Sequence, residues 1–244
     1  MQPLLSLKGV NKSFGALTVA DNIDLDLREG EALGIIGPNG AGKSTLFNLI
    51  GGALRASSGT ITFEGRDLTR MAASERCRAG ISRSFQIPHP FVGMSVYENL
   101  LAASFFGNSG HGNVETACRD ILALTGLLAR ANTPAGQLTL LERKRLELSR
   151  ALATGPKLLL LDEIAGGLTE AECHQLVETI RGIRESGVSI IWIEHIVHAL
   201  TAVVKRLVVI DFGRIVAQGD PVEVMKDPLV QEIYMGIAVD DQAA

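Results

Sequence analysis

The chain has 244 residues, 46% of them hydrophobic, and a formal net charge of −4. These values predict a folded chain with one large core or two smaller ones, and they exclude a disordered protein. No block of basic residues is present, which argues against nucleic acid as a partner. The three cysteines, Cys77, Cys118 and Cys173, lie far apart without CxxC spacing, so we expect neither a disulfide framework nor a zinc site.

The first half of the chain begins with alternating apolar and polar residues at 5–7 and 23–27, a pattern that predicts antiparallel β structure. The apolar run 32–36 predicts a buried strand, which leads through a glycine-rich loop into an apolar helix at 45–50. Alternation between two glycines at 59–65 predicts one more short strand in the β part.

Helical spacing then extends over residues 96–153 and predicts a helical insertion, with a polar loop at 107–113. A further helix is predicted at 170–184. Buried strands are predicted at three more places, 157–161, 188–193 and 206–210. Strands that alternate with helices indicate an α/β fold with a mainly parallel sheet. The tail after Val239 is too short and polar to fold alone.

The most apolar stretch, residues 187–204, contains Glu194, His195 and His198. It is well short of the roughly 20 apolar residues that span a bilayer, so we expect the chain not to cross a membrane. The start of the sequence has no cationic segment followed by an apolar one, and we therefore expect no secretory signal.

The glycine-rich loop matches the pattern G-x-x-x-x-G-K-[ST] and stands between a predicted strand and a predicted helix. Its residues are Gly37, Pro38, Asn39, Gly40, Ala41, Gly42, Lys43, Ser44 and Thr45. Glycines let successive backbone N–H groups turn toward phosphates, and the helix N-terminus adds its dipole. We expect Lys43 to neutralise the β- and γ-phosphates, Ser44 to place its hydroxyl on Mg²⁺, and Thr45 to support the loop. The alternative is an ordinary glycine turn before a helix.

Polar residues follow two of the predicted strands. Asp162 and Glu163 close the first of these strands, and His195 follows the second. In a parallel sheet these residues should meet at the carboxyl edge, where nucleotides bind. We expect Asp162 to hold Mg²⁺ through water, Glu163 to orient or deprotonate the attacking water, and His195 to bond the γ-phosphate. The alternatives are a polar strand end and a structural histidine.

This ordered set of motifs resembles the ABC ATPases over nearly the whole chain. The resemblance implies a single ABC ATPase domain over 1–244, with a P-loop NTPase core at 1–95 and 154–244, an antiparallel β subdomain and a helical subdomain inserted at 96–153. By the same resemblance, Phe14 takes the place of the aromatic residue that stacks on adenine, and a buried β-sheet phenylalanine is the alternative. Gln86 matches the glutamine that joins Mg²⁺ to the interface with the membrane subunits.

Two stretches, SRSFQIPHPFVGMSVYENLLAA and DPLVQEIYMG, resemble the ATP-binding subunits of branched-chain amino acid importers. This resemblance implies ATP and Mg²⁺ as cofactors and hydrophobic amino acids as cargo. It also implies membrane-spanning subunits, a second ATPase chain, an external solute-binding protein and a place on the cytoplasmic face of the inner membrane. The alternatives are a lipid-linked exporter or another importer, a soluble ABC ATPase not tied to transport, and a non-hydrolysing regulatory subunit.

The chain departs from the family at the L-S-G-G-Q-like signature, which caps the partner's γ-phosphate. The equivalent residues are Leu138, Thr139, Leu140, Leu141 and Glu142. Thr139 can replace the serine hydroxyl, but both glycines are missing, and leucine at a left-handed or close-approach position would cost about 1–2 kcal/mol. One interpretation is a variant that still offers backbone donors near Glu142. The other is an asymmetric pair in which the partner carries an intact signature, which favours a heterodimer.

Overall fold

The structure is a computed structural model that describes residues 2–107 and 113–235. Most of the loop expected at 107–113, and all of the tail after Val239, lie outside these residues. Within the described ranges, every helix is too short or too polar to pass through a bilayer.

The antiparallel β part predicted from the first residues is confirmed. Leu7 of β1 stands opposite Leu25 of β2 on one side and Ile61 of β4 on the other, so their apolar side chains share one buried face. The strand order in this sheet is β2-β1-β4-β5. The strands are β1 (Leu5–Phe14), β2 (Leu17–Leu27), β4 (Ser58–Phe63) and β5 (Arg66–Asp67).

The predicted mainly parallel sheet is also confirmed, with the strand order β10-β9-β3-β8-β7-β6. All neighbouring strands in it are parallel except β10, which runs antiparallel to β9 at one edge. The strands are β3 (Ala32–Ile36), β6 (Ile81–Ser84), β7 (Leu158–Asp162), β8 (Ser189–Ile193), β9 (Arg206–Asp211) and β10 (Arg214–Gly219). Strands β6 and β10, which the sequence did not predict, form the two edges.

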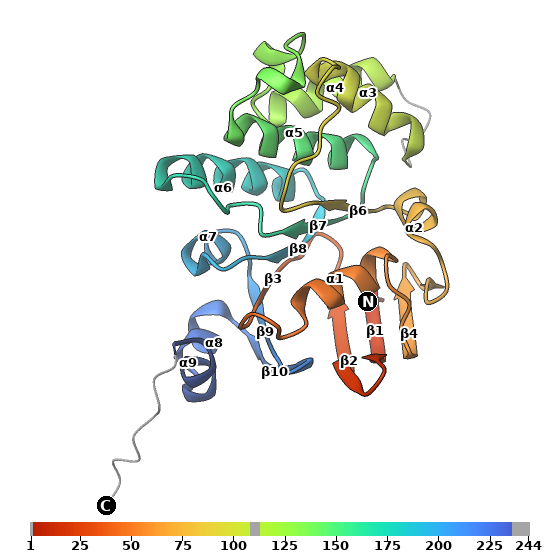
Figure 1. Cartoon of the computed structure of the whole chain (residues 1–244), viewed down its shortest axis with the longest axis vertical. Helices are drawn as coiled ribbons and strands as arrows, with labels where there is room; N and C mark the ends of the chain where they lie inside the picture. Colours follow the sequence, from red (N-terminus) through yellow and green to blue (C-terminus); the bar gives the residue numbers. More distant parts are fainter. Residues whose placement is uncertain (1, 108–112, 236–244) are drawn as a thin grey trace, which may run out of the picture.

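Helices cover both faces of the parallel sheet, which explains why its central strands are continuous apolar runs (Figure 1). One face packs with α1 and the antiparallel sheet in a common hydrophobic cluster, and the other packs against α6 and α7. The helices outside the 96–153 region are α1 (Lys43–Gly51), α2 (Ala73–Ala79), α6 (Glu170–Glu185), α7 (Val197–Thr201), α8 (Pro221–Lys226) and α9 (Pro228–Met235).

Three helices lie together at the top of Figure 1: α3 (Val96–Phe106), α4 (Val114–Leu124) and α5 (Leu140–Ala153). They pack around a hydrophobic cluster of their own, to which each contributes buried side chains. Helix α5 also reaches the sheet, because its Leu141 and Leu148 belong to the cluster beneath α6. This helix therefore connects the upper helices with the strands that end at the candidate site.

Candidate nucleotide site

The glycine-rich loop joins β3 to α1, as predicted. At two of its positions the chain passes so close to its neighbours that only glycine fits. A Cβ on Gly37 would lie 2.1 Å from the carbonyl oxygen of Ile210, and one on Gly42 would lie 2.5 Å from that of Val19. Gly42 also has φ 105°, a left-handed conformation that side chains rarely adopt. The loop is thus held tightly between β2 and β9.

Lys43 is the first residue of α1 and is buried. Its Nζ donates to the carbonyl oxygens of Gly37 at 2.7 Å and Pro38 at 2.9 Å, so the side chain folds back across the loop. Burial lowers the pKa of Lys43, and the negative charges of Glu163 and Asp162 oppose that shift. The ammonium group is therefore bonded to the loop and attracted by the two carboxylates.

Glu163, His195 and Gln86 come together at the carboxyl edge of the sheet. The Nε2 atom of His195 lies 2.6 Å from Oε1 of Glu163, and the Nε2 of Gln86 donates to Oε2 of Glu163 at 2.9 Å. Glu163 has φ 45°, a conformation that costs a residue with a side chain about 1–3 kcal/mol and is concentrated at functional sites. The backbone N–H of Glu163 donates to the Ile193 carbonyl oxygen at 2.9 Å, which supports this turn.

Asp162, the last residue of β7, pairs with an arginine that the sequence analysis did not single out. The guanidinium of Arg83 on β6 donates to Oδ2 of Asp162 at 2.5 Å and to Oδ1 of Asn48 on α1 at 2.6 Å. Arg83 therefore orients the carboxylate expected to serve Mg²⁺. The only available signal was its position three residues before Gln86.

A second missed residue is Glu194, between β8 and His195. It is 2% exposed, and its carboxylate accepts hydrogen bonds from the backbone N–H groups of Ala165 and His195. In the sequence it stood out only as a charge that interrupts an apolar stretch.

A cavity of about 180 Å³ brings the P-loop and the catalytic candidate together. It is lined by Val19, by Glu163 and by the loop residues from Asn39 to Thr45. One side of the cavity offers backbone N–H groups and Lys43, which can bind an anion. The other side offers a carboxylate, which can act on a water molecule that attacks this anion. The Ser44 hydroxyl and the Asp162 carboxylate are oxygen donors of the kind that Mg²⁺ prefers, so these residues fit that ion.

Phe14 is the last residue of β1, and its side chain is 50% exposed. The alternative of a buried β-sheet phenylalanine is therefore wrong. The ammonium of Lys12 lies 4.8 Å from the centre of the ring, and Phe14 is not among the residues that line the cavity. An exposed ring at this place is available to stack on a flat ligand.

The backbone strain expected in the signature-like segment is absent. Thr139 caps α5, and Leu140 and Leu141 are the first two residues of the helix, so they are not among the described non-glycine residues with positive φ. The strain prediction was wrong because Thr139 and Glu142 form a capping box that gives this segment helical geometry. The Thr139 N–H donates to Oε2 of Glu142 at 2.9 Å, and the Glu142 N–H donates to the Thr139 hydroxyl at 3.3 Å.

Glu142 also accepts a hydrogen bond from Nε of Arg130 at 2.9 Å. The hydrogen bond from the Thr139 amide holds the pKa of Glu142 below its usual range. The N-terminus of α5 therefore carries its own carboxylate, while Leu140 is 44% exposed at the same end. Leu138 and Leu141 are buried.

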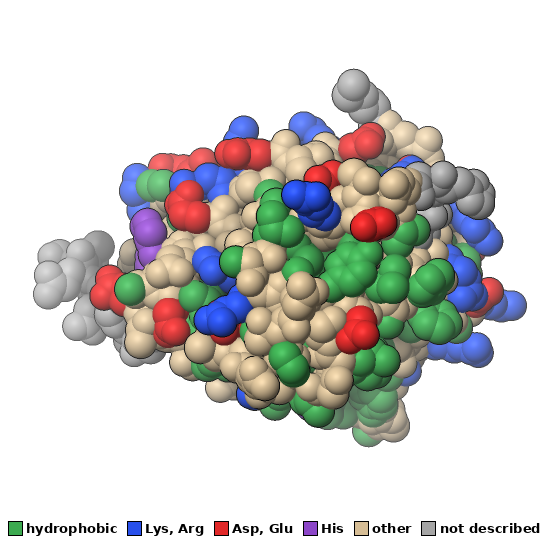
Figure 2. All heavy atoms as spheres, turned by 90° about the horizontal axis from the view of Figure 1, so that it is seen from above, with side chains coloured by type: hydrophobic (Ala, Val, Ile, Leu, Met, Phe, Trp, Pro, Cys, Tyr) green, Lys and Arg blue, Asp and Glu red, His purple; other side chains and the backbone are tan. Residues whose placement is uncertain are grey.

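Exposed hydrophobic side chains flank Gln86 in the sequence and also occur at the end of α3. They include Phe85, Ile87, Phe91 and Val92 between β6 and α3, and Phe105 and Phe106 at the end of α3. Figure 2 shows hydrophobic side chains gathered over part of the face seen from above. A patch of this kind is typical of a surface that meets another protein.

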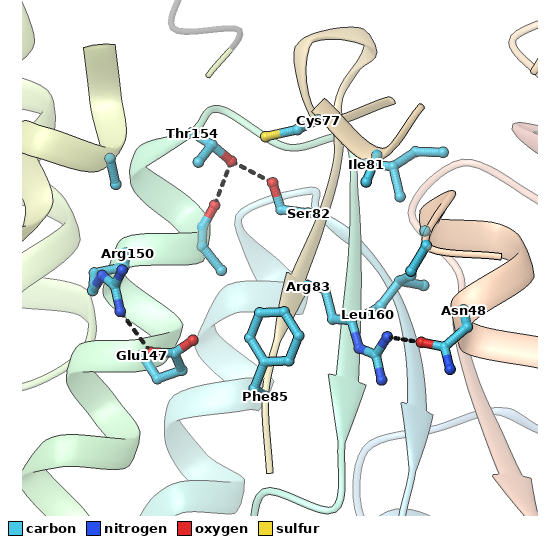
Figure 3. A pocket seen from close by; sticks show the side chains of 15 residues that line it. Asn48, Cys77, Ile81, Ser82, Arg83, Phe85, Glu147, Arg150, Thr154 and Leu160 are labelled. Atoms are coloured by element: carbon cyan, nitrogen blue, oxygen red, sulfur yellow. Dashed lines mark hydrogen bonds and ion pairs between the residues drawn. The ribbon is translucent and has the colours of Figure 1, made fainter. Parts of the chain in front are cut away.

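Beside this patch lies a cavity of about 340 Å³, lined by residues of α1, α2, β6, α3 and α5 (Figure 3). The Phe85 ring stands between Arg83, which bonds Asn48, and the ion pair of Arg150 with Glu147. Burial raises the pKa of Glu147. The cavity is thus apolar in its lining and has charged groups on two sides.

The sequence profile of the family described as "ABC transporter" matches residues 20–166. Among known proteins, the chain is 35% identical to "High-affinity branched-chain amino acid transport ATP-binding protein LivG" of Salmonella typhimurium, over 97% of this chain and 99% of that protein. It is 30% identical to "Lipopolysaccharide export system ATP-binding protein LptB" of Acidithiobacillus ferridurans, over 97% of this chain and 98% of that protein. The ADP conformation of MJ1267, an ATP-binding cassette of an ABC transporter, has a TM-score of 0.87 and 31% identity, over 97% of this chain and 100% of that one.

Proposed function

The chain belongs to the ABC transporter family as an ATP-binding, ATP-hydrolysing subunit, and we propose that it powers the import of branched-chain or other hydrophobic amino acids. The observation that supports the hydrolytic site is the meeting of Glu163, His195 and Gln86 beside the P-loop. The cargo rests on the similarity to LivG over almost the full length of both chains.

In the proposed reaction, the P-loop amides and Lys43 hold the β- and γ-phosphates, and Phe14 stacks on adenine. Glu163 accepts the proton of a water whose oxygen bonds to the γ-phosphorus, while the bond from that phosphorus to the bridging oxygen breaks and ADP leaves. His195 keeps the Glu163 carboxylate in place and meets the γ-phosphate. Mg²⁺, when bound by Ser44, Asp162 and Gln86, would neutralise phosphate charge.

We propose that the hydrophobic patch and the cavity beside Phe85 receive the membrane-spanning subunits. Subunits of the ABC transporter family work in such complexes. The exposed apolar side chains next to Gln86, which bonds the Glu163 carboxylate, support a contact at this surface. We further propose that the chain works at the cytoplasmic face of the inner membrane, bound to those subunits. An external solute-binding protein would meet the membrane subunits on the other side.

The helices α3 to α5 and their own cluster support the proposed division into a core of 1–95 and 154–244 and a helical subdomain of 96–153 within one ABC ATPase domain. A second ATPase chain completes the assembly, and we propose a heterodimer. A carboxylate and a leucine side chain occupy the helix end that would cap the partner's γ-phosphate, so two copies of this chain would give two defective caps.

The test is copurification of the chain with the membrane subunits encoded beside it, followed by ATPase assays in proteoliposomes. Branched-chain amino acids with their binding protein should stimulate hydrolysis by the unaltered complex. Stimulation by lipopolysaccharide instead would favour export, the activity named for the LptB relative. Recovery with ribosomes or DNA and not with membrane subunits would contradict a transport role.

A further inference from the structure

Glu194 joins the two chain segments that carry the catalytic candidates. Its Oε1 accepts from the N–H of Ala165 at 2.7 Å, and its Oε2 accepts from the N–H of His195 at 3.1 Å. Ala165 lies two residues after Glu163, in the turn that follows β7, whereas His195 follows β8. One buried carboxylate therefore ties these two turns together by charge-assisted hydrogen bonds, which are stronger than neutral ones.

Lys144 brings a buried positive charge to the same region from α5. It is 4% exposed, and its Nζ donates to the backbone carbonyl oxygen of Gln86 at 3.4 Å. Burial lowers the pKa of Lys144, and the charge of Glu194 opposes that shift. Burial raises the pKa of Glu194, while its two backbone donors favour the ionised form.

Both buried charges are costly, because a charge removed from water loses its hydration. Neither is among the residues that line the nucleotide cavity. Each of them bonds the backbone of a residue whose side chain bonds Glu163. Glu194 accepts from the N–H of His195, and Lys144 donates to the carbonyl oxygen of Gln86. The side chains of His195 and Gln86 both bond the Glu163 carboxylate. Helix α5, which carries Lys144, begins at the signature-like segment.

We propose that Glu194 and Lys144 are positioning residues that set the geometry of His195 and Gln86 around Glu163. Through Lys144, a displacement of α5 moves the Gln86 backbone and so changes how the Glu163 carboxylate is oriented. This role rests on the proposed part of Glu163 in hydrolysis. It would connect helices α3 to α5 with the Glu163 carboxylate through the contact between Lys144 and Gln86.

The experiment compares variants of the full chain copurified with its partner subunits. In Glu194→Gln, the single amide oxygen can accept from only one of the N–H groups of Ala165 and His195. The new NH₂ group then faces the other N–H, and two donors cannot form a hydrogen bond. Lys144→Met removes the donor to Gln86, and Lys144→Arg retains a charged donor. The matched control is Glu31→Gln, because Glu31 pairs with Arg206 where β3 and β9 begin, whereas the site lies where the strands of this sheet end.

Loss of positioning should lower kcat by roughly tenfold to a hundredfold. The Kd for ATP, measured with the fluorescent analogue TNP-ATP, should stay unchanged in Glu194→Gln and Lys144→Met. Lys144→Arg should regain most of the lost kcat, and Glu31→Gln should match the unaltered complex. Equal kcat in Glu194→Gln and the unaltered complex would overturn the inference, and so would equal losses of kcat in Lys144→Arg and Lys144→Met.

Folding is checked by the Tm of each variant. If Glu194→Gln does not fold, the two Lys144 variants decide. Failure of both Glu194→Gln and Lys144→Met to fold would overturn the positioning role in favour of a purely stabilising one. An unaltered complex that binds ATP but does not hydrolyse it would contradict the proposed function itself, which separates the two outcomes.

Discussion

The Nε2 atom of His195 lies 2.6 Å from Oε1 of Glu163, while the other oxygen of the same carboxylate accepts from Gln86. Both oxygens of the candidate base are thus oriented by side chains from other parts of the chain, one after β8 and one after β6. A carboxylate that is held from two sides keeps its geometry during proton transfer, which supports catalysis more than binding.

Glu163→Gln should therefore remove most ATP turnover while the complex still binds ATP. The neutral amide retains the shape of the side chain but cannot accept a proton from water, and the expected loss in kcat is about 10²- to 10⁴-fold. Turnover is measured by phosphate release and affinity by TNP-ATP fluorescence. Glu185→Gln, at the exposed end of α6, removes a carboxylate far from the cavity and should leave both values unchanged. An unchanged rate in Glu163→Gln would refute the role of this residue.

Gly42→Ala should abolish ATP binding, because the added Cβ would lie 2.5 Å from the Val19 carbonyl oxygen and would push the loop out of place. Gly187→Ala is the matched control. Gly187 has φ 95°, close to the 105° of Gly42, but nothing lies within 4 Å of its added Cβ. The control should lose about 1–3 kcal/mol of unfolding free energy, from backbone strain, and should bind ATP normally. Equal ATP affinities in the two variants would contradict this account.

The pH dependence of stability should change in opposite directions in Glu147→Gln and Glu142→Gln. Burial raises the pKa of Glu147, so its stabilising contribution is full below the ordinary pKa of a glutamate and is lost as the pH rises through the raised value. The Thr139 amide lowers the pKa of Glu142, so its contribution is present above the ordinary pKa and is lost as the pH falls through the lowered value.

Urea unfolding of the two variants and the unaltered chain, from about pH 3 to about pH 7, measures both effects. Glu147→Gln should remove a decline in unfolding free energy toward higher pH. Glu142→Gln should remove a decline toward lower pH. Parallel curves for all three proteins would show that neither carboxyl group titrates differently in the folded and unfolded states.

The sequence predicted the central strands well, since residues 32–36 and 188–193 are apolar runs and such runs belong to parallel strands buried on both faces. It missed β6, because two serines and an arginine among four residues give no apolar run. The convergence of Glu163 and His195 was predicted from the rule that strand ends meet at one edge of a sheet.

Contacts between residues distant in the chain were not predictable in this way. Arg83 meets Asp162 across 79 positions, and Lys144 meets the Gln86 backbone across 58, and no local pattern marks either pair. The error at Leu140 had a different source. The T-x-x-E pattern of Thr139 and Glu142 is a local signal for a helix start, and it predicts helical and not left-handed leucines.

Restoring the signature tests the proposed asymmetry. A variant with Leu140→Gly, Leu141→Gly and Glu142→Gln removes two leucine side chains and the carboxylate from the N-terminus of α5, where the partner's γ-phosphate would be capped. Without that negative charge, the helix dipole and its N–H groups can stabilise the phosphate. If the partner chain already carries an intact signature, one hydrolytic site works now and a second would be added. The ATP turnover of the assembled transporter should then about double.

The two glycines should each cost the helix roughly 0.5–1 kcal/mol, so turnover is measured below the Tm of the variant. Glu142→Gln alone is the control, since it removes the charge and leaves both leucines. It should give less turnover than the triple variant. If the triple variant has the same turnover as the unaltered complex and folds normally, the leucines and the carboxylate do not limit the second site.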